Sequence, residues 1–80
     1  MDTILADSLM QAAIRCDAAM GNADYMTDLA KQVVEGKNSS AHIALLWKIS
    51  DARNGEDFCA FTEIQELQDA LLRYRQACNL

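Results

Sequence analysis

The side chains in this sequence that could do chemistry are one histidine, three cysteines and a few carboxylates. His42 is the only histidine, and a Cys–His nucleophile pair would need Cys16 or Cys59 to be brought beside it by helix packing. A zinc ion would need all three cysteines and His42 together, but Cys16, Cys59 and Cys78 lack the paired spacing of zinc ligands. We therefore predict no catalytic residue, no metal ligand and no cofactor.

The carboxylates give no stronger indication of catalysis. They occur in pairs at Glu56-Asp57 and at Glu63 and Glu66, and nothing in the sequence buries either pair as a general acid and base would require. Three isolated glycines cannot form a phosphate-binding loop. The sequence favours a protein that is not an enzyme.

Composition and charge indicate what kind of partner to expect. The chain has 80 residues, 51% of them hydrophobic, which is too apolar for intrinsic disorder. Its net charge of −5 argues against binding nucleic acid through phosphate contacts. The same charge suits ordinary solubility, or a partner protein with a basic groove. The predicted partner-binding residues are the acids of the second half: Asp51, Glu56, Asp57, Glu63, Glu66 and Asp69.

The cysteines and the apolar runs indicate the cellular compartment in which the protein is expected. Three cysteines are an odd number with no C-x-x-C spacing, so a disulfide framework is not expected. No signal sequence follows Met1, and no apolar run approaches the roughly 18 residues that cross a bilayer. We expect a cytoplasmic protein with free thiols and no membrane contact.

The elements that would position these residues are helices. The sequence has no proline and only three glycines, and each glycine follows a stretch of helix formers. Four helices are predicted: one from Asp2 or Thr3 to Met20, one that starts after Asn22 as its N-cap and ends at Glu35, one from Ser39 or Ser40 to Arg53, and one capped at Thr62. Thr62 and Gln65 form a predicted capping box. The fold class is all-α: residues 1–80 form one domain, a small bundle of three to four short helices with glycine-terminated turns at Gly21, Gly36 and Gly55.

Helical spacing indicates the packing faces. Two seams at spacings of three and four mark the first and fourth helices, and they consist of Leu5, Leu9, Ala12, Cys16 and Ala19, and of Ile64, Leu67, Leu71, Tyr74 and Cys78. The third helix is apolar on most of its circumference, which is typical of a central helix. One alternative is a hairpin, because Asn54-Gly55 is a strong turn signal and residues 58–61 could form a strand.

A chain of this size has little interior, so some apolar residues are expected to face a second chain as a homodimer. Trp47 is interpreted as core, with an interface anchor as the alternative. Phe58 and Phe61 either clamp the third helix to the fourth or dock a partner. His42 is expected to be solvated. The apolar interface candidates are Leu5, Leu9, Met10, Trp47, Phe58 and Phe61.

The stretch from Leu29 to Arg75 carries a family resemblance. A helix ends in Glu35-Gly36-Lys37-Asn38-Ser39, Ile43-x-x-Leu46-x-x-x-Ser50 follows, and a later helix contains Ala70-Leu71-Leu72-Arg73-Tyr74. This pattern resembles the small enterobacterial biofilm and acid-resistance regulators typified by YmgB (AriR), which are short helical dimers described as connector proteins. The resemblance implies a regulatory dimer without catalytic residues.

Three functions are compatible with these features. The leading hypothesis is a non-enzymatic protein–protein interaction module, such as a bacterial or phage accessory protein, that regulates or inhibits a macromolecular partner. One alternative is a helical subunit or chaperone of a larger bacterial assembly such as a secretion apparatus. The other is the connector-type regulator that the resemblance implies.

Overall fold

The structure is a computed structural model that describes residues 3–36, 38–55 and 60–79. Within these residues the chain forms four α-helices: α1 (Thr3–Met20), α2 (Tyr25–Glu35), α3 (Ala41–Asn54) and α4 (Phe61–Cys78). No strand occurs in these ranges, so the all-α prediction is confirmed. For the described residues the hairpin alternative is wrong, because Asn54 ends helix α3 and Phe61 begins helix α4. Phe58 and Cys59 lie outside the described residues.

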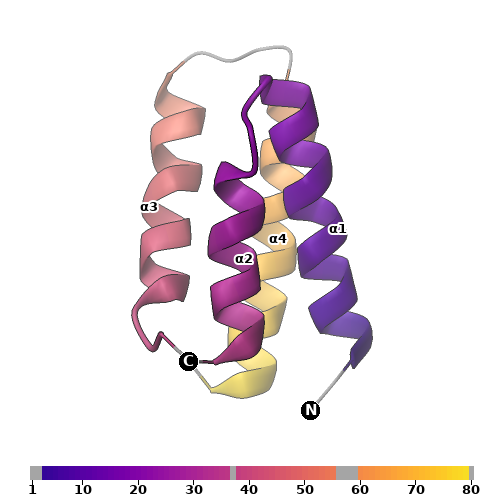
Figure 1. The fold of residues 1–80 in the computed structure, drawn as a ribbon, viewed down its shortest axis with the longest axis vertical. Helices are drawn as coiled ribbons and strands as arrows, with labels where there is room; N and C mark the ends of the chain where they lie inside the picture. Colours follow the sequence, from indigo (N-terminus) through magenta and orange to yellow (C-terminus); the bar gives the residue numbers. More distant parts are fainter. Residues whose placement is uncertain (1–2, 37, 56–59, 80) are drawn as a thin grey trace.

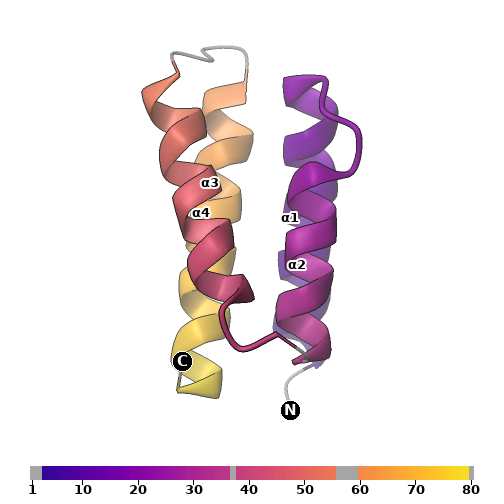
Figure 2. The ribbon, with the colours of Figure 1, turned by 60° about the vertical axis from the view of Figure 1, so that its left-hand side comes forward.

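The four helices form an antiparallel bundle. Each helix packs against two neighbours, in the cyclic order α1, α2, α3, α4. α1 begins and α4 ends at the same end of the bundle, as Figure 1 shows. Turned by 60°, the bundle shows two layers, α1 with α2 and α3 with α4 (Figure 2). The molecule measures 33 × 22 × 20 Å.

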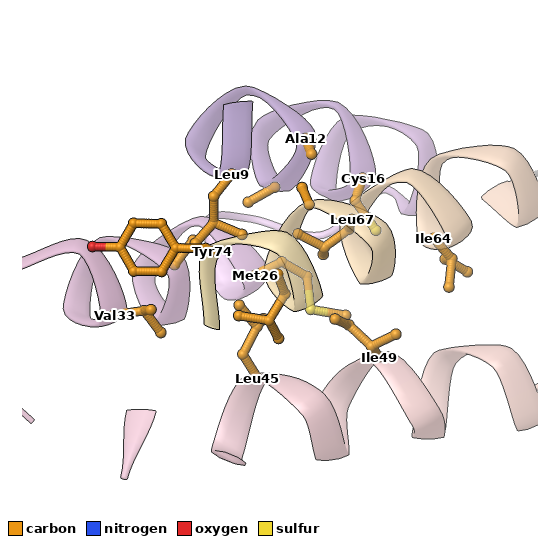
Figure 3. Close-up of a cluster of buried hydrophobic side chains, with 14 of the residues drawn as sticks. Leu9, Ala12, Cys16, Met26, Val33, Leu45, Ile49, Ile64, Leu67 and Tyr74 are labelled. Atoms are coloured by element: carbon orange, nitrogen blue, oxygen red, sulfur yellow. The ribbon is translucent and has the colours of Figure 1, made fainter. Parts of the chain in front are cut away.

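The core lies between these layers and is lined by all four helices (Figure 3). Leu9, Ala12 and Cys16 of the predicted α1 seam are buried, as are Ile64, Leu67, Leu71 and Tyr74 of the α4 seam. Both seams therefore pack inside their own chain. Leu9 has no exposed surface, so its prediction as an interface residue is wrong.

Small residues fill much of this interior beside the buried leucines and isoleucines, and several large apolar residues lie outside it. Within the described ranges, eight of the eighteen buried hydrophobic residues are alanines. Alanine allows helices to approach closely, and closely packed helices leave little space between them for further bulky side chains. Among the residues that the structure describes, seven large hydrophobic ones are exposed: Ile4, Ile14, Tyr25, Ile43, Trp47, Phe61 and Leu72. Trp47 is 67% exposed, so its interpretation as core is wrong.

The turns show where glycine matters. Gly21 has φ +72° and Gly36 has φ +70°, a left-handed conformation that side chains with a Cβ rarely adopt. At the end of α2, the Gly36 N–H donates to the carbonyls of Gln32 and Val33. Gly55 has φ −78°, so a left-handed conformation is not needed there.

Two predicted caps differ from the structure. Thr62 is inside α4, which begins one residue earlier after Ala60, and no side chain caps this helix. Gln65 therefore takes no part in a capping box, and its amide instead donates to Asp69 Oδ1 at 3.2 Å. The N-cap of α2 is Asp24 rather than Asn22, but its side chain makes no capping hydrogen bond.

None of the helices within the described ranges is long and apolar enough to span a membrane.

Candidate functional site

Cys16 and His42, one of the two predicted nucleophile pairs, lie on different helices. Cys16 is fully buried in α1, and its Sγ lies 3.6 Å from Met20 Sδ. His42 lies in the first turn of α3, and the described part of α1 packs against α2 and α4 only. His42 is half-buried rather than solvated, and its Nδ1 is buried without a hydrogen-bond partner among the described residues. This corrects the expectation that His42 is solvated.

The candidate metal ligands do not come together in the described part of the chain. Among the residues with described positions, no group of three or more His, Cys, Asp or Glu side chains could hold a metal ion.

The most specific polar arrangement in the structure surrounds Asp17, a buried carboxylate near the end of α1. Its Oδ1 accepts hydrogen bonds from the Met26 N–H at 2.9 Å and from the Asn22 side-chain amide at 3.1 Å. Its Oδ2 accepts from the Thr27 N–H at 2.8 Å and from the Thr27 hydroxyl at 2.7 Å. Asp17 thus caps the N-terminus of α2 from a different helix.

This arrangement affects the charge state of Asp17. Burial raises its pKa, but the hydrogen bonds from Met26, Thr27 and Asn22 together outweigh burial and hold the pKa below its usual value. Both carboxylate oxygens are occupied by groups of the same chain. Asp17 is therefore a structural residue that fixes α2 against α1.

This cap was not predicted from the sequence, in which Asn22 is the residue expected to cap α2. The sequence signal for this cap was the position of Asp17 in the last turn before Gly21. In the structure, the Asp17 carbonyl accepts the Asn22 N–H at 3.0 Å. That bond closes the turn so that α2 starts beside the Asp17 side chain.

Three of the acidic side chains gather in a groove of about 530 Å³ between α1 and α4. Glu66 and Asp69 of α4 line it together with Asp7 of α1. Arg15 and Arg73 line the same groove, and Arg15 Nε lies 3.7 Å from Glu66 Oε2. The groove therefore carries both signs of charge.

The other predicted acidic residues do not join this groove. Asp51 of α3 lines a separate pocket of about 320 Å³ with Lys48 and Tyr25. Lys48 Nζ lies 4.9 Å from the centre of the Tyr25 ring, and the interaction with Tyr25 raises the Lys48 pKa. Glu63 is half-buried on α4. Glu56 and Asp57 lie outside the described residues.

Several exposed apolar side chains lie on α3 and α4, on a different side of the bundle. Ile43 and Trp47 lie one turn apart on α3 and are 48% and 67% exposed, and Phe61 of α4 is 55% exposed. Between the two helices runs a groove of about 340 Å³, lined by residues that include Leu46, Ser50 and Phe61. We call this side the α3–α4 face and define it by helical position as Ile43, Leu46, Trp47, Ser50, Arg53 and Asn54 of α3 and Phe61, Gln65, Gln68, Leu72, Arg75 and Gln76 of α4.

Two carboxylates adjoin the α3–α4 face. Asp51 lies one turn after Trp47, and Asp69 lies one turn after Gln65 and accepts its amide N–H at 3.2 Å. The two charged residues within the face are arginines at the contact between the helices. Arg53 Nη1 donates to Gln68 Oε1 at 2.6 Å, and Arg75 Nε is buried without a partner in the described part of the chain.

The remaining interface candidates are divided among several environments. Leu5 and Met10 are half-buried and pack against the core from α1. Trp47 and Phe61 belong to the α3–α4 face. Phe58 lies outside the described residues.

Comparison with protein-family models, with curated proteins and with solved structures finds no match to this chain. The resemblance to the YmgB (AriR) regulators stays a prediction from the residue pattern. The function is therefore argued from the geometry of the bundle.

Proposed function

We propose that the protein is a non-enzymatic protein–protein interaction module that regulates or inhibits a macromolecular partner, and that it binds through the α3–α4 face. The proposal includes self-association, which the small size of the chain favours. The observation that carries it is the exposure of Trp47 beside Ile43 on a helix whose opposite side packs the core.

The exposed aromatic area is large enough to contribute to binding. A tryptophan side chain offers up to about 250 Å², so about 170 Å² of Trp47 remains accessible at 67% exposure. Burying that area is worth about 4 kcal/mol before the costs of association, at about 25 cal/mol per Å². Tryptophan is among the residues most often found at the energetic centre of protein interfaces.

The charge pattern supports the same face. The centres of protein interfaces are depleted in charged residues and enriched in aromatic ones. The α3–α4 face has two exposed aromatic side chains, Trp47 and Phe61, and the nearest carboxylates, Asp51 and Asp69, lie at its edges. The groove between α1 and α4, by contrast, already pairs Glu66 with Arg15.

The experiment is affinity capture from the native host followed by mass spectrometry, with two matched variants. Ile43 and Ile14 are the same residue type at 48% and 44% exposure, on α3 and α1 respectively. We expect Ile43→Lys to lose the captured partner at least tenfold and Ile14→Lys to retain it.

Salt dependence separates this proposal from binding through acidic side chains. Capture through the α3–α4 face should persist when salt is raised, because apolar contacts are not screened. Binding through acids such as Glu66 and Asp69 to a basic groove should weaken steeply. Equal capture by both variants, combined with loss in high salt, would contradict the proposed face.

A further inference from the structure

We infer that the segment bound by the α3–α4 face is an acidic amphipathic helix of a partner protein, which places two carboxylates against Arg53 and Arg75 and an apolar stripe between them. The inference rests on the proposed function, because it gives the chemistry of a partner for the same face.

The hollows of the α3–α4 face are lined by arginine and, within the described residues, by no carboxylate. Arg53 and Phe61 line the groove of about 340 Å³ between the two helices. Arg75 and Leu72 line a second hollow, of about 530 Å³, farther along α4. By contrast, the groove between α1 and α4 is lined by three carboxylates, and the pocket beside Tyr25 is lined by one. An acidic partner therefore meets opposite charge in the hollows of this face.

The two carboxylates at the edges of the face have cations beside them in the neighbouring hollows. Asp51 and Lys48 line the same pocket and are three residues apart on α3. Asp69 and Arg73 line the groove between α1 and α4 and are four residues apart on α4. Residues at these spacings are neighbours on a helix. Each of these carboxylates is therefore balanced outside the face.

Arg53 and Arg75 have no such counter-charge. In the described ranges the ion pair found is that of Arg15 with Glu66, and neither arginine of the face takes part in one. Arg53 Nη1 donates to the neutral Gln68 Oε1, and Arg75 Nε is buried without an acceptor among the described residues. A partner that covered both arginines with apolar side chains alone would bury unpaired charges, which opposes binding. A partner that supplies carboxylates replaces this cost with charge-assisted hydrogen bonds.

The positions of the two arginines give the spacing of the acids. The Arg53 guanidinium lies beside Gln68 of α4, and Arg75 follows Gln68 by seven residues, which is two helical turns or about 10 Å. Leu72 lies between these two levels and is 40% exposed. A helix lying along α4 presents a matching order when it carries acids seven residues apart, with apolar residues three or four places after the first.

The helical form of the partner segment follows from its backbone. Backbone N–H and C=O groups that leave water on binding need hydrogen-bond partners. An extended segment finds them at the edge of a sheet, and the described part of the chain has no strand. A helix satisfies these groups within itself and can lie in a groove between two helices.

The net charge of −5 does not prevent this contact. Exposed charges farther apart than about 8–10 Å are largely screened at physiological ionic strength, so the charges at the contact dominate. Electrostatic complementarity sets specificity more than affinity. Binding should therefore persist in high salt through apolar contacts with side chains such as Trp47, while Arg53 and Arg75 select an acidic helix.

The test uses three synthetic peptides of about 18 residues, each a helix of about 27 Å with one leucine stripe and no tryptophan. The first peptide carries two glutamates seven residues apart beside the stripe. The second has glutamine at both positions. The third has the composition of the first, but both glutamates lie on the opposite side of the helix, so that its net charge is unchanged.

Binding is followed by the emission of Trp47, the only tryptophan in the chain, with peptide up to about 1 mM to reach millimolar dissociation constants. The first peptide is expected to bind about tenfold more tightly than the other two, because it alone forms charge-assisted hydrogen bonds with the arginines. Arg53→Gln and Arg75→Gln should each remove most of this preference. Arg73→Gln, in the groove between α1 and α4, is the matched control and should retain it. Far-UV circular dichroism checks that each variant remains helical.

Equal affinity for the three peptides, or no binding of the first at about 1 mM, would overturn the inference. So would a preference that survives both in Arg53→Gln and in Arg75→Gln. Vesicles of anionic phospholipid give a further arm, in which binding that depends on both arginines, without binding of the first peptide, would replace the acidic helix by a membrane surface.

Failure of this inference and failure of the proposed function are distinguishable. A protein that captures its partner through Ile43 but shows no preference for the first peptide would refute the acidic helix and leave the interaction module standing. A protein that prefers the first peptide through Arg53 and Arg75 but captures no partner through this face would refute the regulatory function and leave the peptide specificity standing.

Discussion

Replacing Asp17 by alanine should destabilise the bundle more than any change at the nominal cap of α2. The substitution removes the acceptor for the backbone N–H groups of Met26 and Thr27 and for the Thr27 hydroxyl. Met26 is 2% exposed, so water cannot readily replace the lost acceptor at its buried N–H. If α2 stayed folded in this variant, its N-terminus would contain backbone N–H donors without an acceptor.

The magnitude follows from these bonds. Loss of an N-cap costs up to about 2 kcal/mol, and the additional hydroxyl bond to a charged acceptor brings the expected loss to about 2–3 kcal/mol. An 80-residue domain has a total stability on the order of 4–12 kcal/mol. At about 4–8 °C per kcal/mol for a domain of this size, the melting temperature should fall by about 8–24 °C.

Urea denaturation followed by far-UV circular dichroism measures this loss, and Asp24→Ala is the matched control. Asp24 occupies the N-cap position of α2 but makes no capping hydrogen bond through its side chain. Its replacement should cost less than about 1 kcal/mol, from the helix dipole alone. Equal losses for the two variants, or a larger loss for Asp24→Ala, would refute the assignment of Asp17 as the cap.

Three further predictions concern the same core and turn. Because the folded-state pKa of Asp17 is lowered, its stabilising effect should be fully present above the unfolded pKa of about 3.9 and lost as pH falls through the folded value. The difference in unfolding free energy between wild type and Asp17→Ala should therefore shrink below about pH 4. A difference that widens there would contradict the lowered pKa of Asp17. Leu67→Ala removes a side chain with no exposed surface and should cost about 2–5 kcal/mol in urea denaturation, whereas a loss below about 1 kcal/mol would place Leu67 outside the core. In a Cys59→Ser background, a thiol reagent should modify the half-buried Cys78 much faster than the buried Cys16, and equal rates measured by mass spectrometry would contradict the burial of Cys16.

The sequence alone determined the helices and two of the buried seams. Spacings of three and four on the first and fourth helices identified Leu9, Cys16, Leu67 and Tyr74 among others, and all four are buried. This succeeds because side chains that far apart share one side of a helix, and a side that is apolar throughout must be covered. The predicted end of the second helix at Glu35 is also where α2 ends.

Only the tertiary structure decided which side of α3 faces inward. That helix is apolar on most of its circumference, so its periodicity offers no single direction. Packing against α2 and α4 buries Leu45 and Ile49 and leaves Ile43 and Trp47 outside. The α3–α4 face could not be predicted from the sequence for the same reason. Its members come from two helices whose relative rotation no local pattern encodes.

The capping of α2 was likewise decided by tertiary structure. Local rules place an N-cap within the residues that precede a helix, and on that basis Asn22 was the best candidate. The acceptor is Asp17, nine and ten residues before the N–H groups that it binds. Its position depends on the left-handed turn at Gly21 and on the packing of α1 against α2. A carboxylate can cap a helix of another segment only after the chain has folded back, and this is a property of the assembled bundle rather than of any short stretch of sequence.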